Sequence, residues 1–164
     1  MVNAIFTKSD ICTIDSTDLN TLVDKARLSH NYRYRYCMHI DHNALIQEMV
    51  IAMTNKSYNR PHRHPAGITE SYHLIRGKLM VLFFDDSGAI TKKVFLHSEG
   101  NQLLRMNAPV YHMVISLCET SLYHETLTGP FDKDSVVEYA DWAPEEGEEK
   151  GWIYLEKLKK EELK

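Results

Sequence analysis

The sequence predicts a single-domain, mainly β protein, a sandwich or barrel with one helix before the sheets and one after them. Two observations predict this fold class. Short stretches rich in branched and aromatic residues recur at regular spacing between residues 32 and 127, and turn-forming residues separate them. The length of 164 residues suits one domain with its own core and is too short for two ordinary domains.

The N-terminal part of the chain predicts an extended arm, a helix and a first strand. Residues 1–15 form the expected arm. Ser16 or Thr17 is a suitable N-cap, and the apolar residues that follow have helical spacing up to about Ser29. Residues 32–36 alternate tyrosine and arginine, as in a strand with tyrosines on one face and arginines on the other. We expect the tyrosines to pack the helix onto the sheet.

The middle of the chain predicts strands separated by turns. A tight turn is expected at Arg76-Gly77, residues 85–88 are typical turn residues, and Gly129-Pro130 ends the last strand. The predicted strands are Met49–Thr54, Ser71–Ile75, Lys78–Phe84, Ile90–Leu96, Gln102–Met106, His112–Leu117 and Ser121–Leu127.

The composition becomes strongly charged beyond Pro144. One apolar stripe at helical spacing is formed there by Trp152, Leu155, Leu158 and Leu163. We therefore divide the chain into an N-terminal arm (1–15), a domain with its leading helix (16–147) and a charged C-terminal helix (148–164). The last helix is expected to pack on the domain or on a partner subunit.

Composition and charge exclude several classes of protein. The apolar fraction of 43% and the charged fraction of 26% are typical of a soluble globular domain. The net charge of -4 argues against a nucleic-acid partner, which favours a basic surface. Three widely spaced cysteines predict neither a disulfide framework nor a paired-cysteine metal site. Neither a secretory leader nor a membrane span is visible, so a cytoplasmic location without membrane contact is expected.

The clearest chemical signal lies in residues 60–65, which read Arg-Pro-His-Arg-His-Pro. In a strand, His62 and His64 point to the same side with alpha carbons about 7 Å apart. Two imidazoles so placed can converge on one ion with bonds of about 2.1 Å. Glu70 follows after a short loop, and His112 stands far downstream, after a turn proline. Three imidazoles and one carboxylate predict a site for one divalent ion, whether Zn, Fe, Mn or Ni, with positions left open for water or substrate.

These residues resemble the motifs of a known superfamily. His62-x-His64 with Glu70 and Gly77 resembles the first cupin motif, and Pro109-x-x-His112 resembles the second. The chain is also similar, over about residues 16–147, to the WbuC-like cupin metalloproteins, which are often encoded beside surface-polysaccharide genes. Four segments carry this closer resemblance: residues 60–65, 84–88, 129–132 and 142–147. The resemblance implies a jelly-roll β-barrel that holds the ion through His62, His64, Glu70 and His112.

Three further residues are candidates for roles beside the ion. Glu125 matches the family pattern as a general base or a partner of a ligand, with structural packing as an equal alternative. It adjoins His124, and only one of the two can face the interior. Tyr72 shares a face with Glu70, either as a proton donor or as a packed core residue. Arg60 could hold a phosphate or carboxylate, with a surface ion pair as an equal alternative.

The remaining histidines are expected on the surface, at helix ends or on the outward side of a strand. These are His30, His39, His42, His73 and His97.

Three functions are compatible with such a site. The first is a metalloenzyme, such as an isomerase or epimerase, acting on a sugar or sugar-nucleotide intermediate of surface-polysaccharide biosynthesis. The second is an Fe(II)-dependent oxygenase of a small metabolite. The third is a non-catalytic binding module. The expected partner is a small polar molecule, and an exposed edge strand leaves a homodimer open.

Overall fold

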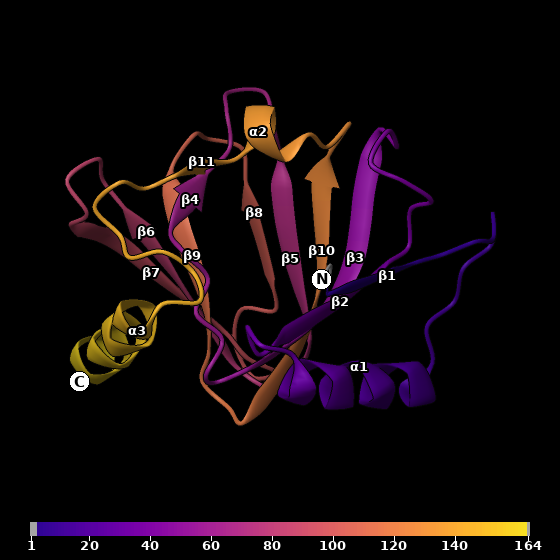
Figure 1. Cartoon of the computed structure of the whole chain (residues 1–164), viewed down its shortest axis with the longest axis horizontal. Coiled ribbons are helices and arrows are strands. Elements are labelled where there is room, and N and C mark those ends of the chain that lie inside the picture. The colour runs from indigo at the N-terminus through magenta and orange to yellow at the C-terminus, as the bar shows by residue number, and fades with distance from the viewer. Residues whose placement is uncertain (1–2, 164) are drawn as a thin grey trace.

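Two β-sheets face each other in the computed structural model, which describes residues 3–163 (Figure 1). The first has six strands in the spatial order β1 (Ala4–Phe6), β2 (Arg33–Cys37), β3 (Ile46–Thr54), β10 (Thr120–Thr128), β5 (Glu70–Arg76) and β8 (Leu103–Met106). The second has five, in the order β11 (Glu138–Tyr139), β4 (His62–Arg63), β9 (Tyr111–Ser116), β6 (Leu79–Phe84) and β7 (Ile90–Leu96). The expected mainly β fold is confirmed, and the seven strands predicted between residues 49 and 127 are present.

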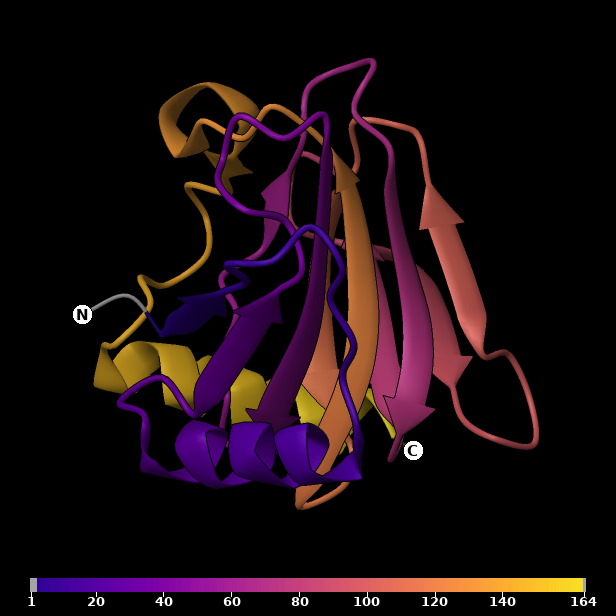
Figure 2. The same cartoon turned by 90° about the vertical axis from the view of Figure 1, so that its right-hand side faces the viewer.

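The helix α1 (Ser16–Leu28) covers the outer face of the six-stranded sheet, across the ends of β2 and β3 (Figure 2). Its N-cap is Asp15, so the prediction of Ser16 or Thr17 was wrong. The Asp15 carboxylate accepts hydrogen bonds from the N–H groups of Thr17 and Asp18, and the Asp18 side chain accepts one from the N–H of Asp15. This reciprocal capping box fixes the helix start more firmly than one hydroxyl can.

Strand β2 separates the helix from the space between the sheets. Tyr34 and Tyr36 pack against α1, as predicted from their alternation with arginine. Arg33, Arg35 and Cys37 point to the opposite side, between the sheets. Residues 4–6 of the expected arm form β1, which pairs with β2 in parallel, whereas all other paired strands named above are antiparallel.

The apolar run of β6 is buried on both of its faces. Leu79, Val81 and Phe83 face the core between the sheets, which also contains Met49, Ile51, Met53, Leu74, Leu96, Met106 and Val114. The alternate residues Met80, Leu82 and Phe84 face outward and are covered by the C-terminal helix. A strand with helix on one side and sheet on the other shows no alternation of polarity, which explains its continuous apolar sequence.

The C-terminal helix is α3 (Glu149–Glu162), which lies beside the five-stranded sheet in Figure 1. Leu155 and Leu158 are buried and Trp152 is half-buried against that sheet, whereas Leu163 is 54% exposed and takes no part in the stripe. Between β10 and α3 lie the short helix α2 (Lys133–Val136) and strand β11, which the sequence did not predict. Residues 1, 2 and 164 of the expected arm and helix lie outside the described residues.

The three cysteines, all of which the structure describes, are free, as their spacing predicted. No helix within residues 3–163 has the length and apolar character that crossing a membrane requires.

Candidate metal centre

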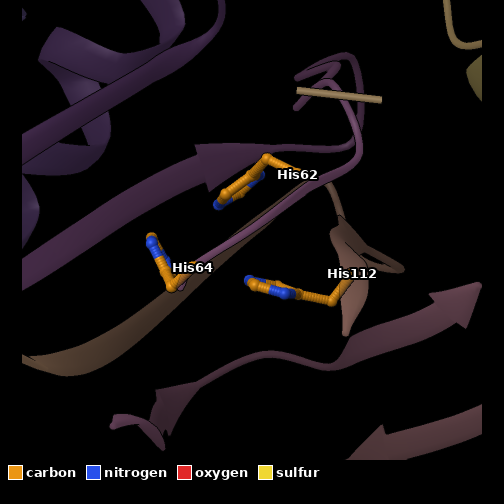
Figure 3. Close-up of side chains that lie close together, drawn as sticks. All are labelled: His62, His64 and His112. Atoms are coloured by element: carbon orange, nitrogen blue, oxygen red, sulfur yellow. The ribbon is translucent and has the colours of Figure 1, made fainter. Parts of the chain in front are cut away.

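Three histidines on or directly after two neighbouring strands meet between the sheets (Figure 3). His62 on β4 is the direct register partner of His112 on β9, and His64 follows just after β4. Pro61 and Pro65 flank this segment and limit β4 to two residues, because proline cannot donate a ladder hydrogen bond. One ring nitrogen of each histidine lies within 4.8 Å of one nitrogen of each of the other two. The predicted convergence of these three side chains is confirmed.

The backbone fixes the orientation of all three rings. Their Nδ1 atoms lie 3.0 Å from the carbonyl oxygen of Arg60 for His62, 2.6 Å from that of Val136 for His64, and 3.0 Å from that of Val110 for His112. A carbonyl oxygen can only accept, so each Nδ1 carries the hydrogen and donates it. Each neutral ring therefore presents a bare Nε2, the form in which histidine binds a metal ion.

Glu70 reaches the histidine cluster from β5 of the other sheet. Its Oε2 lies 3.0 Å from His112 Nε2 and 3.4 Å from His64 Nε2. Its Oε1 accepts a hydrogen bond of 2.9 Å from the Tyr72 hydroxyl. Within residues 3–163, Oε2 and His112 Nε2 are both buried and have no hydrogen-bond partner. Two buried acceptors in contact need a proton or a metal cation between them, since their lone pairs otherwise repel.

The separations of these donor atoms suit a metal ion. Two atoms that each lie about 2.1 Å from one ion are about 3.0 Å apart at a right angle and about 3.4 Å apart at the tetrahedral angle. The protonation states suit it as well. Although burial opposes ionisation, the positive charge of protonated His112 and His64 holds the pKa of the Glu70 carboxyl well below its usual range. Burial opposes the charged form of His64 too, but the contact with Glu70 raises its pKa, so a metal ion would take the place of this proton. Burial, assisted by His112, lowers the pKa of His62 to about 3. At neutral pH the carboxylate is charged and His62 is neutral, as ligation requires.

A cavity of about 470 Å³ adjoins the cluster, and its wall includes His62, His64 and Glu70. Glu125 on β10 faces this cavity, whereas His124 points away from it and lies 3.8 Å from Glu48. The question of which of the two adjacent residues faces the interior is thereby answered. Burial raises the pKa of Glu125 to about 7, and the charge of Glu70 acts in the same direction.

We expect the Glu125→Gln variant of the metal-free protein to be more stable than the parent at pH 8, by about 1–3 kcal/mol. The raised pKa means that the folded state holds this proton over a pH range in which the unfolded chain has lost it. The contribution of Glu125 to stability is therefore full below its usual pKa and is lost as the pH rises through about 7. Glutamine carries no charge to bury.

Urea unfolding of both proteins at pH 8 and pH 5, after chelation, measures this difference. It should shrink to under about 1 kcal/mol at pH 5. The same exchange at Glu99, an exposed carboxylate in a turn, should change stability equally little at both pH values. A gain for Glu125→Gln that does not depend on pH would contradict the expectation.

The other two candidate residues are engaged by the protein itself. Tyr72 is 1% exposed, and its hydroxyl donates to Glu70. Arg60 donates from Nε and Nη2 to the carbonyl oxygen of Ala140, at 3.2 and 2.9 Å, and its Nη1 pairs with Glu145 at 2.7 Å. Arg60 is not part of the cavity wall. Arg60 therefore forms an ion pair, which was the predicted alternative to binding a phosphate or carboxylate.

Two residues of the cavity wall, Arg33 and Arg35, were not among the predicted site residues. Their signal was the alternation of tyrosine and arginine, which places the arginines opposite the helix and therefore inside. The prediction that His39 lies on the surface or at a helix end was wrong. His39 is buried beside the cavity, with its ring edge-on to Phe6 and its Nδ1 at hydrogen-bonding distance from the backbone of Glu48. His73 is exposed, as expected.

Comparison with solved structures identifies the fold. Oxalate oxidase in complex with the substrate analogue glycolate matches with a TM-score of 0.52 at 11% identity, over 68% of this chain and 57% of that chain. Protein SO0799 from Shewanella oneidensis matches with a TM-score of 0.56 at 12% identity, over 77% and 85%. CapF, a capsular polysaccharide assembling protein from Staphylococcus aureus, matches with a TM-score of 0.52 at 13% identity, over 62% and 30%. The chain thus spans less than two thirds of the oxalate oxidase and CapF chains.

At such identities the similarity shows the fold alone, and the expected cupin fold is confirmed. No curated protein sequence matches the chain. The family model described as "Domain of unknown function (DUF6016)" matches residues 14–96, just over half of the 164 residues. This segment contains His62, His64 and Glu70, and it ends before His112. The chain therefore belongs to the DUF6016 family and has the cupin fold.

Proposed function

We propose that the protein binds one divalent metal ion through His62, His64, His112 and Glu70. The observation that carries this proposal is the common arrangement of the three rings. Each Nδ1 is held by a backbone carbonyl, and the Nε2 atoms of His64 and His112 lie against the unpaired Oε2 of Glu70. A donor set of three imidazoles and one carboxylate accepts Zn, Fe, Mn or Ni.

We further propose that the bound ion serves catalysis on a small polar molecule in the adjoining cavity. The ion would polarise an oxygen atom of that molecule. The carboxyl of Glu125, which burial holds at a pKa of about 7 in the metal-free protein, would take up or release the proton. Tyr72 would act as a positioning residue, since its hydroxyl holds Glu70. Isomerisation or epimerisation fits best, because both reactions need an oxygen polarised by the ion and a proton moved by a side chain such as Glu125.

The proposed substrate is a sugar or sugar-nucleotide intermediate of surface-polysaccharide biosynthesis. This part of the proposal is supported by the resemblance of residues 60–65, 84–88, 129–132 and 142–147 to the WbuC-like cupins. CapF is described as a protein of capsular polysaccharide assembly, but its 13% identity supports only a common fold. A cavity of about 470 Å³ is within the usual range of small-molecule sites.

Metal analysis of the purified protein tests the metal site, and ligand screening on a Co(II)-substituted form tests the substrate class. About one ion per chain is expected, and a sugar or sugar nucleotide that reaches the open positions should change the visible spectrum of the bound cobalt. Absence of a bound ion in metal-supplemented preparations would overturn the site. A full panel of sugars and sugar nucleotides without spectral effect would overturn the substrate class.

An Fe(II)-dependent oxygenase is the second candidate, because the same donor set holds Fe(II) with positions free for oxygen and substrate. Oxygen uptake by the iron-loaded protein with candidate metabolites separates it from the first candidate. A protein that retains only zinc and consumes no oxygen would exclude this alternative.

We expect Tyr72→Phe to weaken metal binding about 10-fold, the lower end of the effect of losing a hydrogen bond to a ligand. The change leaves Glu70 Oε1 buried without a donor, so the carboxylate is no longer held in one orientation. Competition with a chromophoric chelator measures the affinity. The matched control is Tyr58→Phe, which removes a buried hydroxyl that donates to the carbonyl oxygen of Pro144, in the other core cluster. Equal metal affinity of both variants would contradict the expectation.

A further inference from the structure

Two arginines on β2 face the cavity from the side of the six-stranded sheet. Arg33 and Arg35 are two residues apart in a strand, so their side chains leave the same face. Neither belongs to the proposed metal site, and neither has a part in the proposed proton transfer. An arginine that faces a cavity is costly to bury unless its charge is matched, which makes its partners informative.

The partners account for only part of the hydrogen-bonding capacity of the two guanidinium groups. Arg33 Nη2 lies 3.3 Å from both carboxylate oxygens of Glu146, whereas its Nη1 is buried and has no hydrogen-bond partner within residues 3–163. Within residues 3–163, the Arg35 side chain makes one hydrogen-bonding contact, a weak one of 3.9 Å from its Nη1 to the sulfur of Met49. Over the same residues, Arg35 forms no ion pair with any carboxylate.

The carboxylates of the cavity wall are Glu70, Glu125 and Glu146, against the positive charges of Arg33, Arg35 and Lys133. Glu70 lies against His64 and His112, and Glu146 pairs with Arg33. Glu125 faces the same space as Arg35 without forming an ion pair with it. With a dication at the histidines, the cavity wall carries an excess of positive charge that no protein group neutralises. A bound anion would neutralise it.

We propose that the ligand of this cavity is a small organic anion, whose carboxylate or phosphate is held by Arg35 together with the free Nη1 of Arg33. The proposal deepens the proposed function and rests on it, because a second oxygen of the same ligand would reach the metal ion. A planar guanidinium can donate two parallel hydrogen bonds to a carboxylate or phosphate, and such charge-assisted pairs are about twice as strong as neutral ones. Within the sugar class, the proposal selects acidic or phosphorylated sugars over neutral ones.

The polar groups around the two arginines suit such a ligand. Asn59 lies in the cavity wall, and its side-chain amide forms no hydrogen bond within the described part of the chain. It is available to the hydroxyl groups of a sugar. Met49 and Ile51 form an apolar part of the same cavity wall. The cavity thus combines an anion-binding wall, hydrogen-bonding groups and a metal-binding wall, as a small polar anion with several oxygens requires.

Calorimetric titration of the metal-loaded protein with three probes tests the proposal. The probes are D-glucuronate, glucose 1-phosphate and neutral glucose. We expect at least one of the two anions to bind more than about 10-fold more tightly than glucose, and Arg35→Met to remove most of that advantage. Arg35→Lys should fall between the parent and Arg35→Met, since lysine keeps the charge but not the planar fork. The preferred anion decides between a carboxylate and a phosphate.

The matched control is Arg105→Met, which removes an exposed arginine on β8 and should leave all three affinities unchanged. Metal content and melting temperature of each variant show that the site is loaded and the chain folded. Glucose bound as tightly as both anions, or an Arg35→Met variant that binds them as tightly as the parent, would overturn this inference. A parent protein that holds no ion would instead overturn the proposed function, so the two failures are distinguishable.

Discussion

Replacing His112 by alanine should reduce the metal affinity by more than about 100-fold, so that the purified variant holds almost no ion. Loss of a single hydrogen bond behind a metal ligand already costs about 10–100-fold, and here the ligand itself is lost. His112 Nε2 makes the shorter of the two contacts with Glu70 Oε2, at 3.0 Å. His112 is also the direct register partner of His62. Without its ring, only His62, His64 and Glu70 remain as donors.

Plasma mass spectrometry gives the metal content, and thermal unfolding with and without added ion gives a second readout. An ion at 100 times its dissociation constant should stabilise the parent by about 2.7 kcal/mol, and the variant should show no such gain. His124→Ala is the matched control, because His124 lies on the outward face of β10 beside Glu48. One ion per chain in His112→Ala would show that this histidine is not a ligand.

Much of this site could be predicted because its signals are local. The alternation of side chains in a strand places His62 and His64 on one side, and the turn proline before His112 marks the start of another strand. The role of the backbone could not be predicted in the same way. The carbonyl of Val136, which fixes the ring of His64, belongs to α2, a helix of four residues without a periodic pattern long enough to recognise.

The cavity was harder to predict than the ligands. The sequence placed Arg33 and Arg35 on the strand face opposite the tyrosines, but it does not show that a cavity lies behind that face. His39 was placed on the surface or at a helix end, although it is only 7% exposed. The side of a strand that faces the interior depends on what packs against the other side. Here, α1 covers Tyr34 and Tyr36 and leaves the arginines inside.

Gly77→Ala should lower the free energy of unfolding by about 2–4 kcal/mol, through backbone strain and close contact together. Gly77 has a φ of +91° in the turn between β5 and β6, a conformation that alanine adopts only with strain. A Cβ at this position would lie 2.6 Å from Ser121 Oγ and 2.8 Å from the carbonyl oxygen of Thr120. The Ser121 hydroxyl cannot turn aside freely, because it donates to the carbonyl oxygen of Lys78 at 3.0 Å and contacts Ser116 Oγ at 2.8 Å.

The control for this prediction is Gly147→Ala, with a φ of +85° and no atom within 4 Å of the added Cβ, which should cost only about 1 kcal/mol. Urea unfolding of the metal-free proteins compares the two, and equal losses would contradict the contact argument. Metal affinity should not change in Gly77→Ala. Gly77 follows the far end of β5 from Glu70, about 23 Å along an extended strand. Gly77, the glycine of the first motif, therefore stabilises the turn and takes no part in metal binding. His112→Ala should abolish metal binding, whereas Gly77→Ala should lower stability and leave metal affinity unchanged.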